Sequence, residues 1–190
     1  MTMPHTKERI LGAAEELMWE KSFHAVGLSE ILKAVGVPKG SFYHYFESKE
    51  HFGVEMLKHY IEEATAEKTR RLHSQEAVAD PIQRLLDMLG ESIAVFQGKG
   101  GKCPCLVLKL ASEVTDLSEP MREELAKGMD TWLGILSAVF EEAIVKGRVA
   151  KGTDPDYEAR IFRDLWAGAI QRATILKSVE PMETAHAFIR

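Results

Sequence analysis

The sequence predicts an all-α protein of about nine helices, and three observations support this fold class. Apolar residues recur at spacings of three and four positions along most of the chain. The pairs Asp80-Pro81 and Asp154-Pro155 combine an N-capping side chain with a proline suited to the first helical turn. The strand-like run CLVLKL at 105–110 has no second strand to pair with, so we expect it to be helical too.

In the N-terminal part, three short helices are expected. The first is capped by Thr6 and carries an apolar stripe that reaches Met18. The second covers 28–35, with Ser29 as its N-cap and Gly36 as its end. After a tight turn, the third covers Ser41 to Phe46. Capping residues and apolar spacing predict the later helices over about 48–72, 81–97, 103–115, 119–146 and 155–177, with one more after Pro181.

Composition excludes several classes of protein. The 190 residues allow one large domain, or a small domain and a medium one. With 45% apolar and 28% charged residues, the chain is neither disordered nor collagen-like. It has no apolar run near the ~20 residues of a membrane span, and its N-terminus lacks the apolar core of a secretory signal. Because Cys103 and Cys105 cannot close a long loop, we expect no disulfide framework and a cytoplasmic location.

The second and third predicted helices form a helix-turn-helix motif, because the segment from Gly36 to Gly40 supplies the tight turn that this motif needs. Phe42, Tyr45 and Phe46 recur at helical spacing and should pack inward. The opposite face carries hydroxyl, aromatic and cationic groups of the types that contact phosphates and base edges. Although the net charge of −5 argues against a generally basic surface, a local nucleic-acid site is therefore expected here.

Lys49 also indicates a site for a nucleic-acid phosphate. It lies in the first turn of the helix over 48–72, where the helix dipole disfavours a cation. A bound phosphate would resolve this misfit and would also use the free backbone N–H groups around Ser48.

The run VGVPKGSFYHYF at 35–46, with GLSEIL before it and Ser48-Lys49-Glu50 after it, resembles the DNA-binding domain of TetR-family repressors. The resemblance implies a helix-turn-helix DNA-binding domain over 1–50 and an effector-binding and dimerisation domain over 51–190. It also implies a homodimer on a palindromic operator, with Pro38 and Lys39 favoured for base readout. By position, it places the DNA contacts at Thr6, Ser29, Pro38, Lys39, Gly40, Ser41, Tyr43, His44 and Lys49.

The helices over 119–146 and 155–177 are expected to form the dimer bundle, because Ala167-Gly168-Ala169 would let two backbones approach closely. The alternative is that their apolar stripes are only intramolecular core. Trp132 and Trp166 fit a core, a dimer interface or a pocket wall, and with Phe96 they are the candidates for an effector pocket.

The segment around Cys105 resembles one TetR branch, that of the N-ethylmaleimide reductase repressor and the acrylate-responsive repressor. Cys105 matches the branch's cysteine, which implies a thiol that senses electrophiles. The preceding glycine of the branch is replaced by Pro104, and a late lysine of the branch falls on Thr174. A second thiol, Cys103, is the other candidate sensing residue. A helix beginning near Pro104 would place Cys105 in its first turn, where the dipole favours a thiolate. A buried structural cysteine is the alternative.

The sequence thus predicts a repressor that a small reactive electrophile releases from its operator, with the helix over 48–72 coupling the effector site to the DNA-binding domain. A reversibly bound effector, with Cys105 only lining the pocket, is the alternative. A helical thiol enzyme is disfavoured, because Cys-x-Cys lacks the Cys-x-x-Cys spacing and the neighbouring histidine of such enzymes. We expect no enzymatic activity, no cofactor, no metal and no membrane partner.

Overall fold

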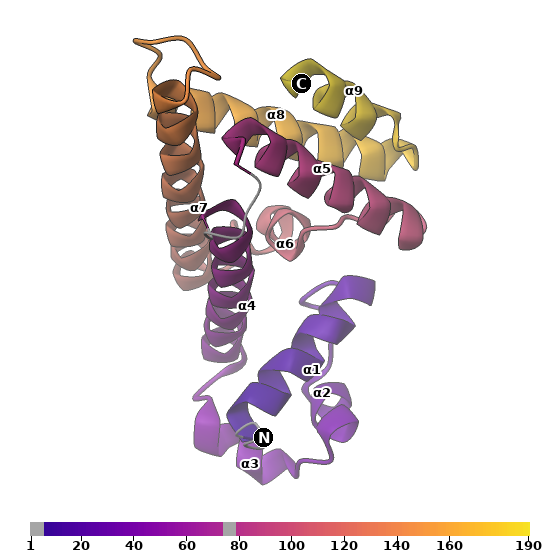
Figure 1. Ribbon diagram of the computed structural model, residues 1–190. Coiled ribbons are helices and arrows are strands. Elements are labelled where there is room, and N and C mark those ends of the chain that lie inside the picture. The colour runs from indigo at the N-terminus through magenta and orange to yellow at the C-terminus, as the bar shows by residue number, and fades with distance from the viewer. Residues whose placement is uncertain (1–5, 74–78) are drawn as a thin grey trace. The chain divides into compact units, whose positions relative to one another are not determined.

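The computed structural model describes residues 6–73 and 79–190, and every regular element within those ranges is a helix (Figure 1). This confirms the all-α prediction. No helix in these ranges is both long and apolar enough to cross a membrane. The helices are α1 (Thr6–Glu20), α2 (Leu28–Val35), α3 (Lys39–Tyr45), α4 (Lys49–His73), α5 (Pro81–Gly98), α6 (Leu106–Val114), α7 (Glu119–Val145), α8 (Pro155–Leu176) and α9 (Glu180–Ile189).

Four of the helix starts follow their predicted N-caps. The side chains of Ser48, Asp80, Ser118 and Asp154 each accept a hydrogen bond from a backbone amide two or three positions later. At the end of α2, Gly36 adopts the left-handed conformation with φ of 66°, as predicted for a glycine that ends a helix.

One predicted N-cap and two predicted helix starts are wrong, although α2 itself begins at residue 28 as predicted. Ser29 lies inside α2, whose N-cap is Gly27 and has no side-chain cap. α3 begins at Lys39 rather than Ser41, because the extended backbone of Pro38, with ψ of 147°, turns directly into the helix. α6 begins at Leu106, so Cys105 stands one position before the first helical residue instead of inside the first turn.

The chain divides into two compact units. The first contains the residues up to 64 together with 109–128, and the second contains 65–108 and 129–190. α4, α6 and α7 therefore each contribute residues to both units. The functional division at residue 50 remains a prediction.

The first unit is built on an aromatic cluster. Phe42 of α3 lies 5.0 Å from Phe46 and 5.4 Å from Phe52, measured between ring centroids, and all three rings are buried. Gly53 of α4 lets two neighbours approach closely, because a Cβ at that position would lie 2.7 Å from Phe23 Cζ and 2.8 Å from Met121 Sδ. This packing fixes α3 against the start of α4.

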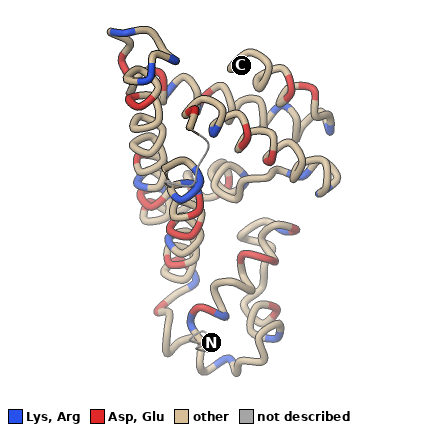
Figure 2. The backbone as a smooth tube through the Cα atoms, viewed as in Figure 1, with Lys and Arg blue, Asp and Glu red and all other residues tan. Residues whose placement is uncertain are grey.

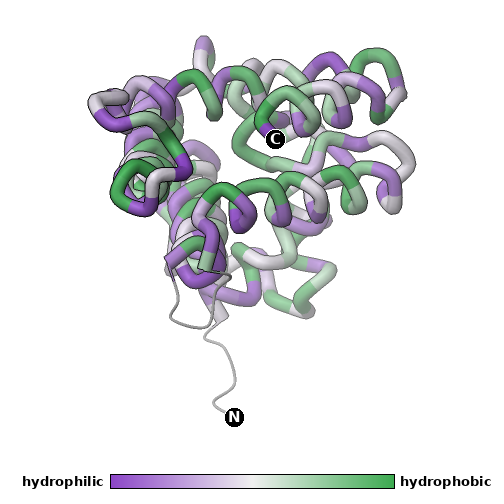
Figure 3. The backbone as a smooth tube through the Cα atoms, turned by 45° about the horizontal axis from the view of Figure 1, so that its top comes forward, coloured by the Kyte–Doolittle hydropathy of each residue, from purple (hydrophilic) through white to green (hydrophobic). Residues whose placement is uncertain are grey.

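The second unit has two apolar clusters, and its amphipathic helices are visible in Figure 3 as alternating green and purple segments. The first cluster includes Leu136, Val139 and Phe140 of α7. These residues belong to the stripe expected at a dimer interface, and their burial within one chain supports the alternative that this part of the stripe is intramolecular core. The second cluster consists of Phe96, Ile170, Ala173 and Met182.

Candidate nucleic-acid interface and thiol site

α2 and α3 form the helix-turn-helix. The turn is tight because Gly36, in its left-handed conformation, directs its own N–H to the Lys33 carbonyl while the Val37 N–H donates to the Leu32 carbonyl 2.9 Å away. Pro38 then starts α3 without an N–H group of its own. The turn is thus specified by one glycine and one proline, as the sequence indicated.

α3 buries its apolar side and presents a polar one. Phe42 is buried, whereas Tyr43 has 58% of its surface exposed and Ser41 is half-buried. α3 contains no acidic residue, and Figure 2 shows no red segment along it. The polar side thus offers donors and a cation without a competing carboxylate on the helix itself, which suits it to phosphates. The remaining exposed residues of this surface are Pro38, Lys39, Gly40 and His44.

The other predicted DNA contacts differ in their surroundings. Ser29 is exposed and Thr6, the first residue of α1, is half-buried. Lys49 is exposed, but its Nζ lies 3.4 Å from the carbonyl oxygen of His24 and 5.2 Å from the centroid of the Phe23 ring. Through these contacts Lys49 already has partners within the chain. A bound phosphate is therefore not required to explain a lysine at this helix start.

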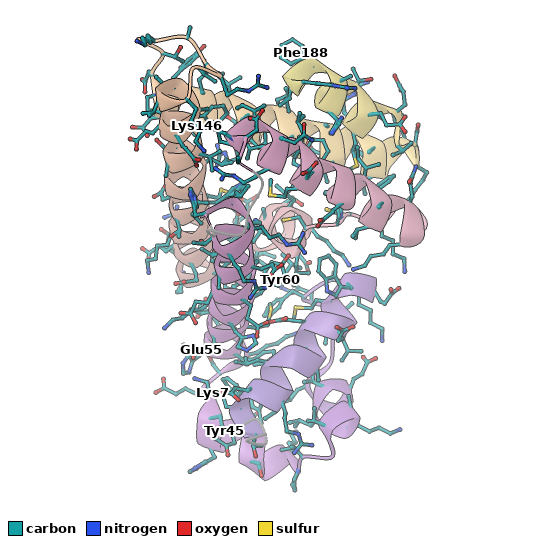
Figure 4. All side chains as sticks on the ribbon, viewed as in Figure 1. Lys7, Tyr45, Glu55, Tyr60, Lys146 and Phe188 are labelled. Atoms are coloured by element: carbon teal, nitrogen blue, oxygen red, sulfur yellow. The ribbon has the colours of Figure 1, made fainter. Side chains whose placement is uncertain are left out.

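Ion pairs join α1 to α4 within the first unit. Lys7 Nζ lies 2.5 Å from Glu55 Oε2, and Figure 4 shows the two labelled side chains close together. The hydrogen bond from Lys7 holds the pKa of Glu55 below its usual range, although burial opposes it. Glu15, His59 and Glu63 bring three possible metal-ligand atoms within 4.8 Å of one another. His59 Nδ1 already lies 2.8 Å from Glu15 Oε1, so a hydrogen bond accounts for this pair without a metal.

α6 fastens the segment that connects α1 to α2. Lys109 Nζ lies 2.5 Å from the carbonyl oxygen of Met18 and 2.7 Å from that of Trp19, so it caps the end of α1. One turn later, the Glu113 carboxylate accepts hydrogen bonds from the backbone amides of Phe23 at 3.0 Å and His24 at 2.9 Å. We call this pair of contacts the α6 clamp.

Hydrogen bonds favour the ionised form of Glu113, the acidic residue of the α6 clamp. Burial of Glu113 favours its neutral form, but hydrogen bonds from His24 and Phe23 outweigh that effect and hold its pKa below its usual range. Sequence reasoning missed the clamp. Its only signal was a cation and an anion four positions apart in an otherwise apolar segment.

A cavity of 190 Å³ adjoins the clamp within the first unit. It is smaller than typical pockets for drug-sized ligands, which run from about 300 to 1,000 Å³. The candidates for an effector pocket, Trp132, Trp166 and Phe96, are not among its lining residues. Its lining consists of Phe23, His24, Lys49, Glu50, Val114, Leu117, Ser118 and Met121.

The two cysteines are free thiols, both half-buried, at the start of α6. Cys103 packs against the second apolar cluster, and its Sγ donates to the carbonyl oxygen of Cys105 at 3.3 Å. Cys105 occupies the N-cap position of α6, beside the first helical N–H groups. The two thiols therefore differ in their surroundings.

A lysine distant in sequence lies in the same compact unit as Cys105. Lys68 of α4 is half-buried, and its Nζ lies 4.3 Å from the centroid of the Trp132 ring. Burial lowers the pKa of Lys68, and a negative charge at Cys105 opposes that shift. Of the lysines near Cys105 in sequence, Lys109 belongs to the α6 clamp and Lys102 is exposed. Periodicity alone gave no signal for Lys68.

The three aromatic residues proposed for an effector pocket lie in the second unit. Phe96 is buried in the second apolar cluster, and Trp166 packs against both clusters. Trp132 packs against the first cluster with one face toward Lys68. Thr174 donates to the Ile170 carbonyl at 2.8 Å, so its hydroxyl is engaged within α8.

α8 carries apolar side chains that the described chain leaves uncovered. Ile175 has 72% of its surface exposed, and Leu176 and Ile161 of the predicted dimer stripe are also exposed. Ala169, the last residue of the run Ala167-Gly168-Ala169, is buried. Part of the predicted α8 stripe is thus available for association, unlike the stripe on α7.

Comparison with known proteins gave matches over nearly the whole chain. Residues 10–56 match the family described as bacterial regulatory proteins, tetR family, and residues 81–189 match the tetracyclin repressor-like C-terminal domain. The HTH-type transcriptional repressor NemR of Escherichia coli is 37% identical over 97% of this chain and 92% of its own length. The transcriptional regulator AcuR of Cereibacter sphaeroides is 33% identical over 96% of this chain and 81% of its own length. This chain and the crystal structure of the reduced form of E. coli NemR align with a TM-score of 0.89, over 97% of this chain and 95% of the NemR chain.

Proposed function

Because this chain belongs to the TetR family of helix-turn-helix transcriptional repressors, we propose that it is released from its operator when a small reactive electrophile modifies Cys105. The repressor is related to NemR and is not an enzyme, as the sequence predicted. The observation that carries the proposal is the position of Cys105. It is the N-cap of α6, the helix that clamps the DNA-binding motif.

For the DNA-bound state, two copies of the chain present their α3 helices to successive major grooves, about 34–36 Å apart. Lys39 and Pro38 at the start of α3 contact base edges, and Tyr43 and His44 contact the backbone. The exposed, acid-free polar side of α3 supports this assignment. The uncovered apolar part of α8 supports dimerisation through that helix.

The release step begins with bond formation at sulfur. The Cys105 thiol loses its proton to solvent, and the thiolate Sγ forms a bond to an electrophilic carbon of an activated alkene in the effector. The carbon–carbon π bond breaks, and its electron pair takes up a proton from solvent at the neighbouring carbon. The added group occupies the N-cap position, where only the thiol stood before. α6 must shift or lose its first turn to accommodate it.

The α6 clamp transmits this change to the DNA-binding motif. A shift of α6 moves Lys109 and Glu113 relative to the carbonyls and amides they hold, and this alters the segment that positions α2 and α3. The coupling needed is modest, since ~1–3 kcal/mol changes affinity by about 5–150-fold. α4, the coupler predicted from the sequence, also joins both units and acts in parallel.

The second candidate function keeps the repressor and makes the effector reversible, with Cys105 only lining the pocket. The half-buried state of Cys105 and the aromatic residues of its unit favour a binding site there. This candidate differs from the first in one respect, which is whether sulfur chemistry is needed for release.

Operator binding with and without N-ethylmaleimide separates the candidates. Fluorescence anisotropy on DNA from upstream of the protein's own gene gives the affinity for the parent chain, Cys105→Ser and the matched control Cys103→Ser. The proposal predicts that the reagent releases the parent and Cys103→Ser but not Cys105→Ser. Binding that persists in the treated parent rejects the thiol mechanism and leaves the reversible effector.

A further inference from the structure

Glu15 of α1 and the α4 residues His59 and Glu63 form a cluster in the first unit, and their ligand atoms all lie within 4.8 Å of one another. His59 and Glu63 are four positions apart on α4, so they share one face of that helix. Imidazole nitrogen and carboxylate oxygen are both donor atoms that Zn²⁺ and related ions accept in proteins. The hydrogen bond between Glu15 and His59 accounts for two of the three residues and leaves the second ring nitrogen and Glu63 to be explained.

The hydrogen bond to Glu15 determines which nitrogen of His59 can bind a metal. An ionised carboxylate can only accept, so His59 Nδ1, which lies 2.8 Å from Glu15 Oε1, carries the ring proton. In the neutral imidazole the other nitrogen, Nε2, then has a free lone pair. Metal-binding histidines are usually oriented in this way, by a carboxylate or carbonyl group on the nitrogen that does not bind the metal. Glu15 therefore prepares His59 as a ligand.

The spacing between His59 Nε2 and Glu63 suits a bridging ion. Glu63 Oε1 lies 3.7 Å from Nε2, which is longer than a hydrogen bond. Bonds from Zn²⁺ to nitrogen or carboxylate oxygen are about 2.0–2.2 Å long. Because the separation is shorter than the sum of two such bonds, one ion can bond to both atoms. The Glu63 side chain is 67% exposed, so an ion can reach this position from solvent.

We propose that His59 Nε2 and Glu63 bind a divalent transition-metal ion of the Zn²⁺ or Ni²⁺ type, with water at the remaining coordination positions. Glu15 is a positioning residue that orients the imidazole. Because Glu15 belongs to α1, the ion strengthens the connection between α1 and α4 inside the first unit. The site departs from the expectation that the chain binds no metal, because Glu15 reaches His59 only through folding. It is independent of the thiol mechanism proposed above.

Calorimetric titration with Ni²⁺ tests the site on the full chain with Cys103→Ser and Cys105→Ser, which removes the competing thiols. His59→Gln should abolish the binding of one ion per chain. Glu15→Gln should weaken that binding about tenfold or more, which is the usual cost of losing a partner that orients a metal ligand. Equal affinity in the His59→Gln chain and its thiol-free parent would refute the site and leave an adventitious ion only.

His51 provides the matched control on the same helix. It also lies four positions before a glutamate, Glu55, but its Nδ1 accepts the backbone amide of Glu47 at 3.2 Å. In the neutral ring its proton therefore lies on Nε2, and no lone pair is left for an ion. His51→Gln should keep the parent's Ni²⁺ affinity. If His51→Gln and His59→Gln weaken binding equally, the affinity does not depend on the arrangement around Glu15 and the proposal fails.

Paramagnetic broadening locates the ion without any substitution at the site. In the thiol-free chain, substoichiometric Ni²⁺ should broaden the NMR signals of His59 and Glu63 before those of His51. Broadening centred on another part of the chain would overturn the proposal even if His59→Gln does not fold. Because the chain carries no operator and no reactive thiol in these experiments, their outcomes do not depend on the proposed function.

Discussion

Replacing Glu113 by Gln should loosen the connection between α1 and α2. The Glu113 carboxylate accepts the amides of Phe23 and His24 and lies 3.0 Å from His24 Nδ1. Gln has nearly the same shape, but only one of its terminal atoms is an acceptor. One amide therefore faces a donor in the variant.

The magnitude follows from the number and exposure of these hydrogen bonds. A hydrogen bond to a charged group contributes about 1.5–3 kcal/mol, and leaving a buried donor unpaired is the larger cost. The Glu113 side chain is 21% exposed and His24 lies at the surface, so water recovers part of the loss. We expect a total of about 2 kcal/mol, which makes amide exchange at Phe23 and His24 about 30-fold faster.

Amide hydrogen exchange measures this directly, and thermal unfolding should show a midpoint lower by about 4–8 °C. The matched control is Glu119→Gln, because Glu119 is 64% exposed and pairs with Arg122 within α7. The control should leave exchange at Phe23 and His24 unchanged. Parent-like exchange in Glu113→Gln would refute the α6 clamp.

Acidification should have the same effect as the substitution. The pKa of Glu113 is lowered in the folded chain, so its contribution to stability is fully present above the unfolded pKa of about 4.3 and is lost as pH falls through the folded value. The exchange difference between parent and Glu113→Gln should therefore shrink below about pH 4. A difference that stays constant at lower pH would contradict the role of the ionised carboxylate.

Three further substitutions test the packing, the DNA surface and the dimer. Gly53→Ala places a Cβ 2.7 Å from Phe23 Cζ and should destabilise the chain by about 1–3 kcal/mol in urea, whereas parent-like stability would mean that Phe23 and Met121 move freely. Tyr43→Ala removes a side chain that is 58% exposed, so stability should stay within about 0.5 kcal/mol while operator affinity falls about tenfold in anisotropy; unchanged affinity excludes Tyr43 from the interface. Ile175→Glu places a charge on a residue that is 72% exposed and should give monomers in sedimentation, and a persistent dimer would remove this part of α8 from the interface.

Local chemistry predicted most of the fold. Periodicity located the helices, and caps such as Asp80 and Asp154 act on the nearest amides, so their effect is readable from adjacent residues. Ser29 failed as a cap because Gly27, with its extended backbone, already starts α2 two positions earlier. The turn at Gly36 was predictable because its conformation follows from a single residue type.

The surroundings of the thiol could not be predicted in the same way. Lys68 of α4, which shares a unit with Cys105, meets Trp132 of α7 only through the packing of distant helices, and no spacing rule connects them. The α6 clamp likewise joins Glu113 to the amide of Phe23, which lies 90 positions away in the sequence. The apolar stripe on α7 was ambiguous in sequence, because core and interface require the same residues.

Modification of Cys105 and operator binding should exclude each other. The most direct measurement follows both in one sample, with N-ethylmaleimide added in steps to the Cys103→Ser repressor on its operator. Intact mass gives the extent of Cys105 alkylation, and anisotropy gives the bound fraction. The bound fraction should fall in step with alkylation. A repressor fully alkylated at Cys105 that retains its operator affinity would contradict it.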